Sequence, residues 1–136
     1  MTGELKLTIP SGLPGLESLK EYLLQEVPEN PLFKILQSTE EKDLAFILVK
    51  PMHYFPDYRV KINSDILEEL EGKSLEDLEL YCIVTLAEKW EDITANLLAP
   101  LLVNRGKGLA RQVILEDTEY KTKHFIFSPQ QKVEYG

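Results

Sequence analysis

Cysteine and histidine are scarce in this sequence of 136 residues. Its single cysteine, Cys82, cannot form an internal disulfide, and no Cys/His cluster has the spacing of a zinc site. The two histidines, His53 and His124, stand beside aromatic residues and have no metal-spaced partner. The sequence therefore predicts no metal and no cofactor, and it favours the reducing cytoplasm.

Long apolar runs are also missing. The longest, residues 97–103, contains Pro100 and is far shorter than the roughly 18 residues that cross a bilayer. The N-terminus lacks a basic region followed by an apolar stretch, so it does not resemble a secretion signal. We therefore expect no membrane association.

Basic residues are outnumbered, with 15 Lys and Arg against 23 Asp and Glu, for a net charge of −8. Such a surface repels phosphate, which argues against direct nucleic acid binding and favours a basic protein partner. Residues 65–79 alone carry a net charge of −6. This segment is either a solvated helix and loop or a docking surface for a basic protein.

Catalytic signals are weak. Cys82 lies inside an apolar run, where burial makes a thiol unreactive. The glycines of Gly106-Lys107-Gly108 lack the strand-to-helix context of a phosphate-binding loop and indicate a flexible loop. No pair of carboxylates can be placed in a cleft. The sequence therefore predicts that the protein is not an enzyme.

Apolar residues are abundant, at 43% of the chain, and they follow a period of two that is typical of half-buried strands. We expect one domain, residues 1–136, with a weakly held tail at 129–136. Asp65 as N-cap and Gly72 as the C′ residue predict a helix over 65–71. The predicted class is mainly β: a small antiparallel β-barrel-like domain with one or two short helices. Strands are expected at residues 5–9, 32–36, 44–49, 58–62, 80–86, 97–103 and 112–115. Residues 18–24 form either a short helix or a strand, and a strand after a turn is favoured.

Two asparagines, Asn96 and Asn104, bracket an apolar run that Pro100 interrupts. Proline cannot donate to a sheet ladder, so a bulge, bend or edge is expected here. The asparagines either satisfy turn backbone or flank an open edge for a partner segment.

This stretch resembles a known family. Thr94-Ala95-Asn96-Leu97-Leu98-Ala99-Pro100, followed by Asn104 and Gln112, is similar to the pattern of the flagellar assembly factor FliW family. Residues 12–17, 36–38, 43–46 and 55–58 agree with it in order. The resemblance implies a β-barrel-like fold and no catalysis. It also implies the binding behaviour of that family, whose members bind flagellin and, once flagellin is exported, capture the RNA-binding repressor CsrA.

Two hypotheses about binding residues follow from the acidic segment and the resemblance. Glu68, Glu69 and Glu71 are expected to contribute to a negative field that engages CsrA and weakens phosphate binding. Partner contacts are expected at the motif positions Phe55, Tyr58, Asn96, Asn104 and Gln112. The alternative function is a β-barrel that holds a small apolar ligand in its interior.

Overall fold

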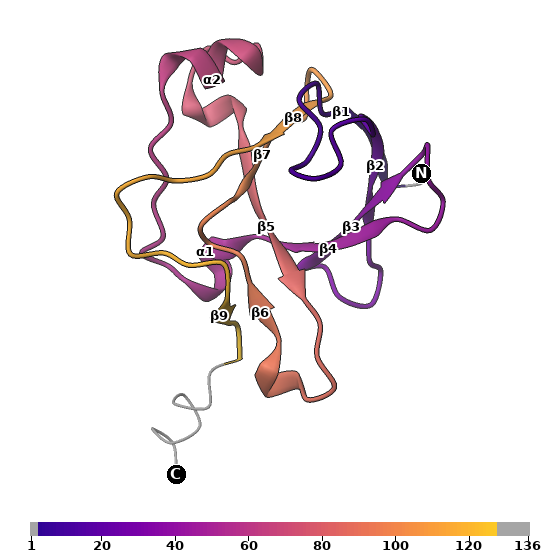
Figure 1. The fold of residues 1–136 in the computed structure, drawn as a ribbon, viewed down its shortest axis with the longest axis vertical. Helices are drawn as coiled ribbons and strands as arrows, with labels where there is room; N and C mark the ends of the chain where they lie inside the picture. Colours follow the sequence, from indigo (N-terminus) through magenta and orange to yellow (C-terminus); the bar gives the residue numbers. More distant parts are fainter. Residues whose placement is uncertain (1–2, 128–136) are drawn as a thin grey trace.

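The computed structural model describes residues 3–127 and consists mainly of short strands (Figure 1). Two short α-helices, α1 (Pro51–Tyr54) and α2 (Ser64–Glu69), and two 3-10 turns, η1 (Leu75–Asp77) and η2 (Trp90–Asp92), lie among them. The strands are β1 (Glu4–Thr8), β2 (Glu21–Glu26), β3 (Phe33–Ser38), β4 (Ala45–Val49), β5 (Glu79–Thr85), β6 (Thr94–Ala95), β7 (Leu101–Asn104), β8 (Leu109–Gln112) and β9 (His124–Phe125).

Seven of these strands close into a barrel in the order β4-β3-β2-β1-β8-β7-β5, and β5 pairs back with β4. All neighbours in the ring are antiparallel except β1 and β8, whose single parallel pair joins Thr8 to Leu109. The ring closes at Gly108, whose carbonyl accepts from Thr8 N at 2.8 Å and whose φ of 67° suits glycine. Residues 106–108 are therefore part of an ordered turn rather than a flexible loop.

Strand β5 is buried on both of its faces. Tyr81 points into the barrel with ten other buried side chains, while Leu80, Cys82 and Val84 pack outside it. Double-sided burial explains why this stretch reads as a continuous apolar run rather than an alternating one. The outer face of the barrel is covered by residues 51–78 and by the chain after β8, which form two further apolar clusters.

The predicted fold class is confirmed, but several predicted strands are wrong. Residues 58–62 pair with no strand of the described chain and run along the outside of the barrel. Their period-two pattern arises because Val60 and Ile62 cover outer-face apolar clusters while Arg59 and Lys61 face solvent. Of residues 112–115 only Gln112 lies in a strand, because the pairing partner of β7 starts earlier, at Leu109.

Of the strand predicted at 97–103, only residues 101–103 lie in a strand, β7. β6 and β7 both pair with the same edge of β5, and residues 96–100 bend away between them. Of the bulge, bend or edge expected around Pro100, the structure shows a bend, at residues 97–99. The strand predicted at 18–24 starts later, at Glu21, because residues 10–19 form turns.

Helix α2 is confirmed near its predicted position, but both of its caps differ. Asn63, not Asp65, is the N-cap, and its Oδ1 accepts from Ile66 N at 3.0 Å. Glu71, not Gly72, is the C′ residue and has a φ of 56°. Gly72 N donates to Leu67 O and Glu71 N donates to Glu68 O, which is the Schellman pattern. The predicted tail, residues 129–136, lies outside the described residues.

Candidate functional site

Three of the predicted contact residues converge on the bend at residues 96–99. Tyr58 donates its hydroxyl to Leu97 O at 2.6 Å, and Gln112 donates Nε2 to Ala99 O at 2.9 Å. Asn96 Oδ1 accepts from the backbone of Leu98 and Ala99 at 3.1 and 3.0 Å. These side chains satisfy backbone groups that a bend would otherwise leave unpaired, so their first role is to hold the turn.

Aromatic rings surround this bend. Tyr58 is buried and packs edge-on against Tyr120 at 4.7 Å, and half-buried Phe55 lies edge-on to His124 at 6.0 Å. Burial raises the pKa of the Tyr58 hydroxyl, and burial also raises the pKa of the Cys82 thiol to about 12. The burial of Cys82 expected from the sequence is confirmed, and a buried thiol with a raised pKa is expected to be unreactive.

Asn104 acts at a different place, between α2 and the β7–β8 turn. Its Nδ2 donates to Leu70 O at 2.8 Å, and its Oδ1 accepts from Lys107 N at 3.3 Å. The side chain is 5% exposed. Asn104 therefore positions the end of the acidic helix against the hairpin, and the five motif residues do not form one surface cluster.

The three predicted acidic residues differ in their surroundings. Glu68 is exposed, and no ion pair is described for it within residues 3–127. Glu69 forms an ion pair and hydrogen bond with Arg111 on β8. Glu71 lies 4.0 Å from Lys107 Nζ in the β7–β8 turn.

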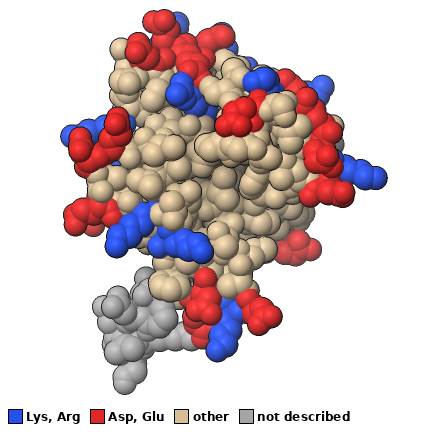
Figure 2. Space-filling view, viewed as in Figure 1, with Lys and Arg blue, Asp and Glu red and all other residues tan. Residues whose placement is uncertain are grey.

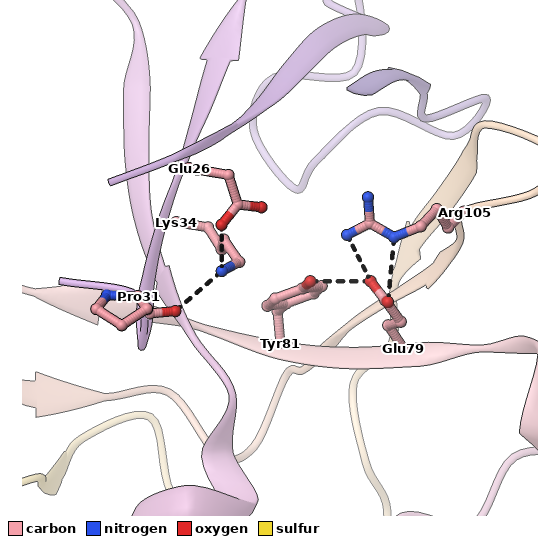
Figure 3. A network of polar contacts seen from close by, with 6 residues as sticks. All are labelled: Glu26, Pro31, Lys34, Glu79, Tyr81 and Arg105. Atoms are coloured by element: carbon pink, nitrogen blue, oxygen red, sulfur yellow. Dashed lines mark hydrogen bonds and ion pairs between the residues drawn. The ribbon is translucent and has the colours of Figure 1, made fainter. Parts of the chain in front are cut away.

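A third pairing joins the start of β5 to the same turn. Arg105 donates to both oxygens of Glu79 at 3.1 Å, and Tyr81 donates its hydroxyl to Glu79 at 2.9 Å (Figure 3). Burial alone would raise the pKa of the Glu79 carboxyl, but the hydrogen bonds from Arg105 and Tyr81 outweigh it and lower that pKa.

The β7–β8 hairpin thus supplies the bases that the acidic segment lacks. Including Arg105, Lys107 and Arg111 changes the local net charge from −6 to −3. Figure 2 shows the result: acidic side chains gather over α2 at the top of the view, with basic ones beside them. Among the seven acids of residues 65–79, those with no described partner within residues 3–127 are Asp65, Glu68 and Glu76.

Sequence reasoning missed a second charged group, Lys34. It points into the barrel from β3, is 7% exposed, and donates to Glu26 at 2.8 Å and to Pro31 O at 3.0 Å (Figure 3). Lys34 is two residues before inward-facing Leu36 and four before inward-facing Ser38, so it lies on the same face of β3. This spacing is the signal that could have located it. Its two partners make it a satisfied structural charge.

Within residues 3–127, no three His, Cys, Asp or Glu side chains are grouped to hold a metal ion. In the same range, no helix has the length and apolar character needed to span a bilayer. The barrel interior is filled by eleven buried side chains, including Tyr22 and Tyr81, which weighs against an apolar ligand there.

Comparisons with known proteins agree with one another. The profile of the FliW protein family matches residues 1–126. The chain is 40% identical over 121 residues to the flagellar assembly factor FliW of Anoxybacillus flavithermus, covering 89% of this chain and 83% of that protein. It is 43% identical over 116 residues to the same factor of a Geobacillus species, covering 85% and 80%. A crystal structure of FliW superposes with a TM-score of 0.86 at 39% identity, over 92% of this chain and 87% of that one.

Proposed function

Because the chain belongs to the FliW family of flagellar assembly factors, we propose that it works in the cytoplasm without catalysis, binding flagellin and, when flagellin is depleted, the translational regulator CsrA. Capture of CsrA relieves the repression of flagellin translation. The observation that carries this proposal is the family match over residues 1–126 together with a shared fold over 92% of the chain.

The charge distribution supports the CsrA part of the proposal. An RNA-binding protein must present basic groups to phosphates, so a partner with a net charge of −8 attracts it. Asp65, Glu68 and Glu76 have no described partner in residues 3–127, and each acts over a Debye length of about 8 Å in cells. Acids placed beside bound CsrA would weaken its hold on phosphate without contacting the RNA-binding surface.

Binding experiments with purified proteins test the proposal. The chain is expected to bind flagellin and CsrA separately, to release flagellin mRNA from CsrA, and to lose CsrA when flagellin is in excess. If the chain bound neither flagellin nor CsrA, the proposal would be contradicted. Binding of the chain itself to RNA would contradict the charge argument.

A matched pair of variants tests the acidic helix. Glu68→Gln removes an exposed, unpaired charge and should weaken CsrA binding by about twofold at physiological salt, while reducing the salt dependence of association. Glu29→Gln removes a similarly exposed charge from the β2–β3 connection and should leave binding unchanged. Equal effects of the two substitutions would show that only net charge matters.

Substitutions at Glu69 and Glu71 affect contacts with the β7–β8 hairpin as well as the surface charge. Replacing all three glutamates, Glu68, Glu69 and Glu71, with Gln should weaken CsrA binding further. Because Glu69 pairs with Arg111 and Glu71 lies near Lys107, part of that loss would come from a displaced hairpin. Unchanged affinity of the triple variant at low salt would contradict the field hypothesis.

Partner contact by the motif residues stays a prediction. Asn104→Ala removes a buried bond to Leu70 O, so the packing predicts a lower melting temperature. An unchanged melting temperature with loss of flagellin capture would support direct contact. Lower stability with normal capture by the folded protein would assign Asn104 to the fold alone.

A further inference from the structure

The segment that joins α1 to α2 has unpaired backbone. We call residues 59–62 the strap; it passes beside the barrel without a turn or bend (Figure 1). Within residues 3–127, no described hydrogen bond involves the backbone N–H or C=O groups of these four residues. Most backbone polar groups of folded proteins have protein partners, so a row of unpaired ones is a ready template for strand pairing.

An apolar groove borders the strap. Val60 and Ile62 form one side of a hollow of about 270 Å³, whose other lining is apolar apart from Arg59 and the hydroxyl-bearing Tyr58. Leu75, 58% exposed, and Met52, 46% exposed, are two of the large apolar side chains that face solvent there. The remaining apolar side chains of the groove are Leu78, Leu80 and Leu102.

The solvent-facing side chains of the strap are basic, and on one side they share a hollow with Glu116 and Asp117. Arg59 and Lys61 are both exposed and alternate with half-buried Val60 and Ile62. Arg59 is held in place by hydrogen bonds from Nη1 to Pro56 O and Tyr58 O. Opposite charges on neighbouring strands are stabilising, so a strand paired with the strap is expected to carry acidic residues on its outer face.

We propose that the strap is a docking edge for an extended segment of a partner protein in which apolar and acidic residues alternate. Its backbone pairs with that of the strap, its apolar side chains enter the groove beside Leu75, and its acidic side chains lie next to Arg59 and Lys61. A bound helix would leave the strap's backbone groups unpaired. The inference does not depend on the identity of the partners proposed above.

A synthetic peptide tests the edge directly. The probe alternates valine and glutamate over about eight residues, enough to cover the strap and its ends. Hydrogen exchange of the full chain should show fast-exchanging amides at residues 59–62, which become at least about tenfold slower with the peptide in excess. Absence of protection at 59–62 would overturn the proposal and would leave flagellin and CsrA binding untouched.

Modified peptides separate the contributions of backbone and charge. A peptide of the same pattern with lysine in place of glutamate should bind at least about tenfold more weakly. A peptide N-methylated at alternate residues, along the edge that faces the strap, should lose binding to a similar extent, because it cannot donate the ladder hydrogen bonds. The assignment would be overturned if the lysine peptide bound as tightly as the glutamate peptide. It would also be overturned if the N-methylated peptide bound as tightly as the unmethylated one.

Matched variants locate the groove. Leu75→Asn should weaken peptide binding, whereas Ile114→Asn, at a residue 61% exposed that lines a hollow on the other side of the strap, should not. Lys61→Glu should weaken binding, and Lys42→Glu, on the distant β3–β4 connection, serves as its charge control. The reverse pattern in either pair would contradict the site. Protection of residues 59–62 that rises with protein concentration alone would instead assign the strap to pairing between two copies.

Discussion

Substitution of tyrosine by phenylalanine is expected to have opposite effects on stability at Tyr22 and at Tyr58. Both side chains are 1% exposed, Tyr22 inside the barrel and Tyr58 on its outer side. The Tyr58 hydroxyl donates to Leu97 O at 2.6 Å, whereas the Tyr22 hydroxyl is buried with no hydrogen-bond partner in the described part of the chain. Phenylalanine keeps the ring and removes only the hydroxyl, so the pair isolates the hydrogen bond.

The magnitudes follow from the cost of burying a polar group. An unsatisfied buried hydroxyl costs about 1–3 kcal/mol, so Tyr22→Phe should raise the free energy of unfolding by about 1 kcal/mol after the loss of some packing. Tyr58→Phe breaks its bond and leaves Leu97 O without that donor, which should lower the free energy of unfolding by about 1–3 kcal/mol. For a chain of this size, 1 kcal/mol corresponds to roughly 3–5 °C in Tm.

Urea unfolding followed by circular dichroism measures both changes, provided that the slope of the transition is the same in all variants. Tyr81→Phe is the internal control: its hydroxyl also has a partner, Glu79, so the variant should be destabilised like Tyr58→Phe. Destabilisation by Tyr22→Phe as large as that by Tyr58→Phe would refute the reasoning, because it would mean that the Tyr22 hydroxyl has a partner of its own.

Further predictions concern pH and backbone strain. Burial raises the pKa of Tyr58 and Tyr81. Their contribution to the free energy of unfolding is therefore fully present below the unfolded tyrosine pKa of about 10 and is lost as pH rises above it. Absorbance should report tyrosine ionisation together with unfolding. Glu71→Gly should raise the free energy of unfolding by about 1 kcal/mol because φ is 56°, whereas Glu71→Ala should not, as melting curves would show. Burial, and to a lesser degree Lys121, lowers the pKa of His124, whose Nε2 accepts from Lys121 N at 2.8 Å. Stability should therefore fall as pH drops below about 6.5, and urea titrations of His124→Gln should show a weaker fall.

Much of the barrel was predictable because its strands alternate or are continuously apolar. Residues 5–9, 32–36, 44–49 and 80–86 overlap β1, β3, β4 and β5, and each carries a pattern that one or two buried faces require. These patterns depend on burial and not on pairing. They therefore also fit the strap, which covers apolar clusters from outside and pairs with no strand within residues 3–127.

The remaining elements depend on contacts between distant parts of the chain. Strand β9 has only two residues, and its place is set by pairing with β6 about thirty positions earlier. Glu71 at the C′ position was not predictable from the preference for glycine, since Gly72 follows it directly. In these cases tertiary packing overrides local propensity.

The acidic segment shows why charge counting located a region but not a surface. A sequence count treats the seven acids of residues 65–79 alike, but the fold distinguishes them. Basic side chains of residues 105–111 pair with Glu69, Glu71 and Glu79, and backbone N–H groups donate to Asp77. Glu79 has a bidentate partner and a lowered pKa, so it stabilises the barrel and is already neutralised toward a partner protein. Glu68 has no such role, and changing it should alter association without altering stability. The distinction is physical, because a charge that is compensated within the fold contributes little to the field outside it.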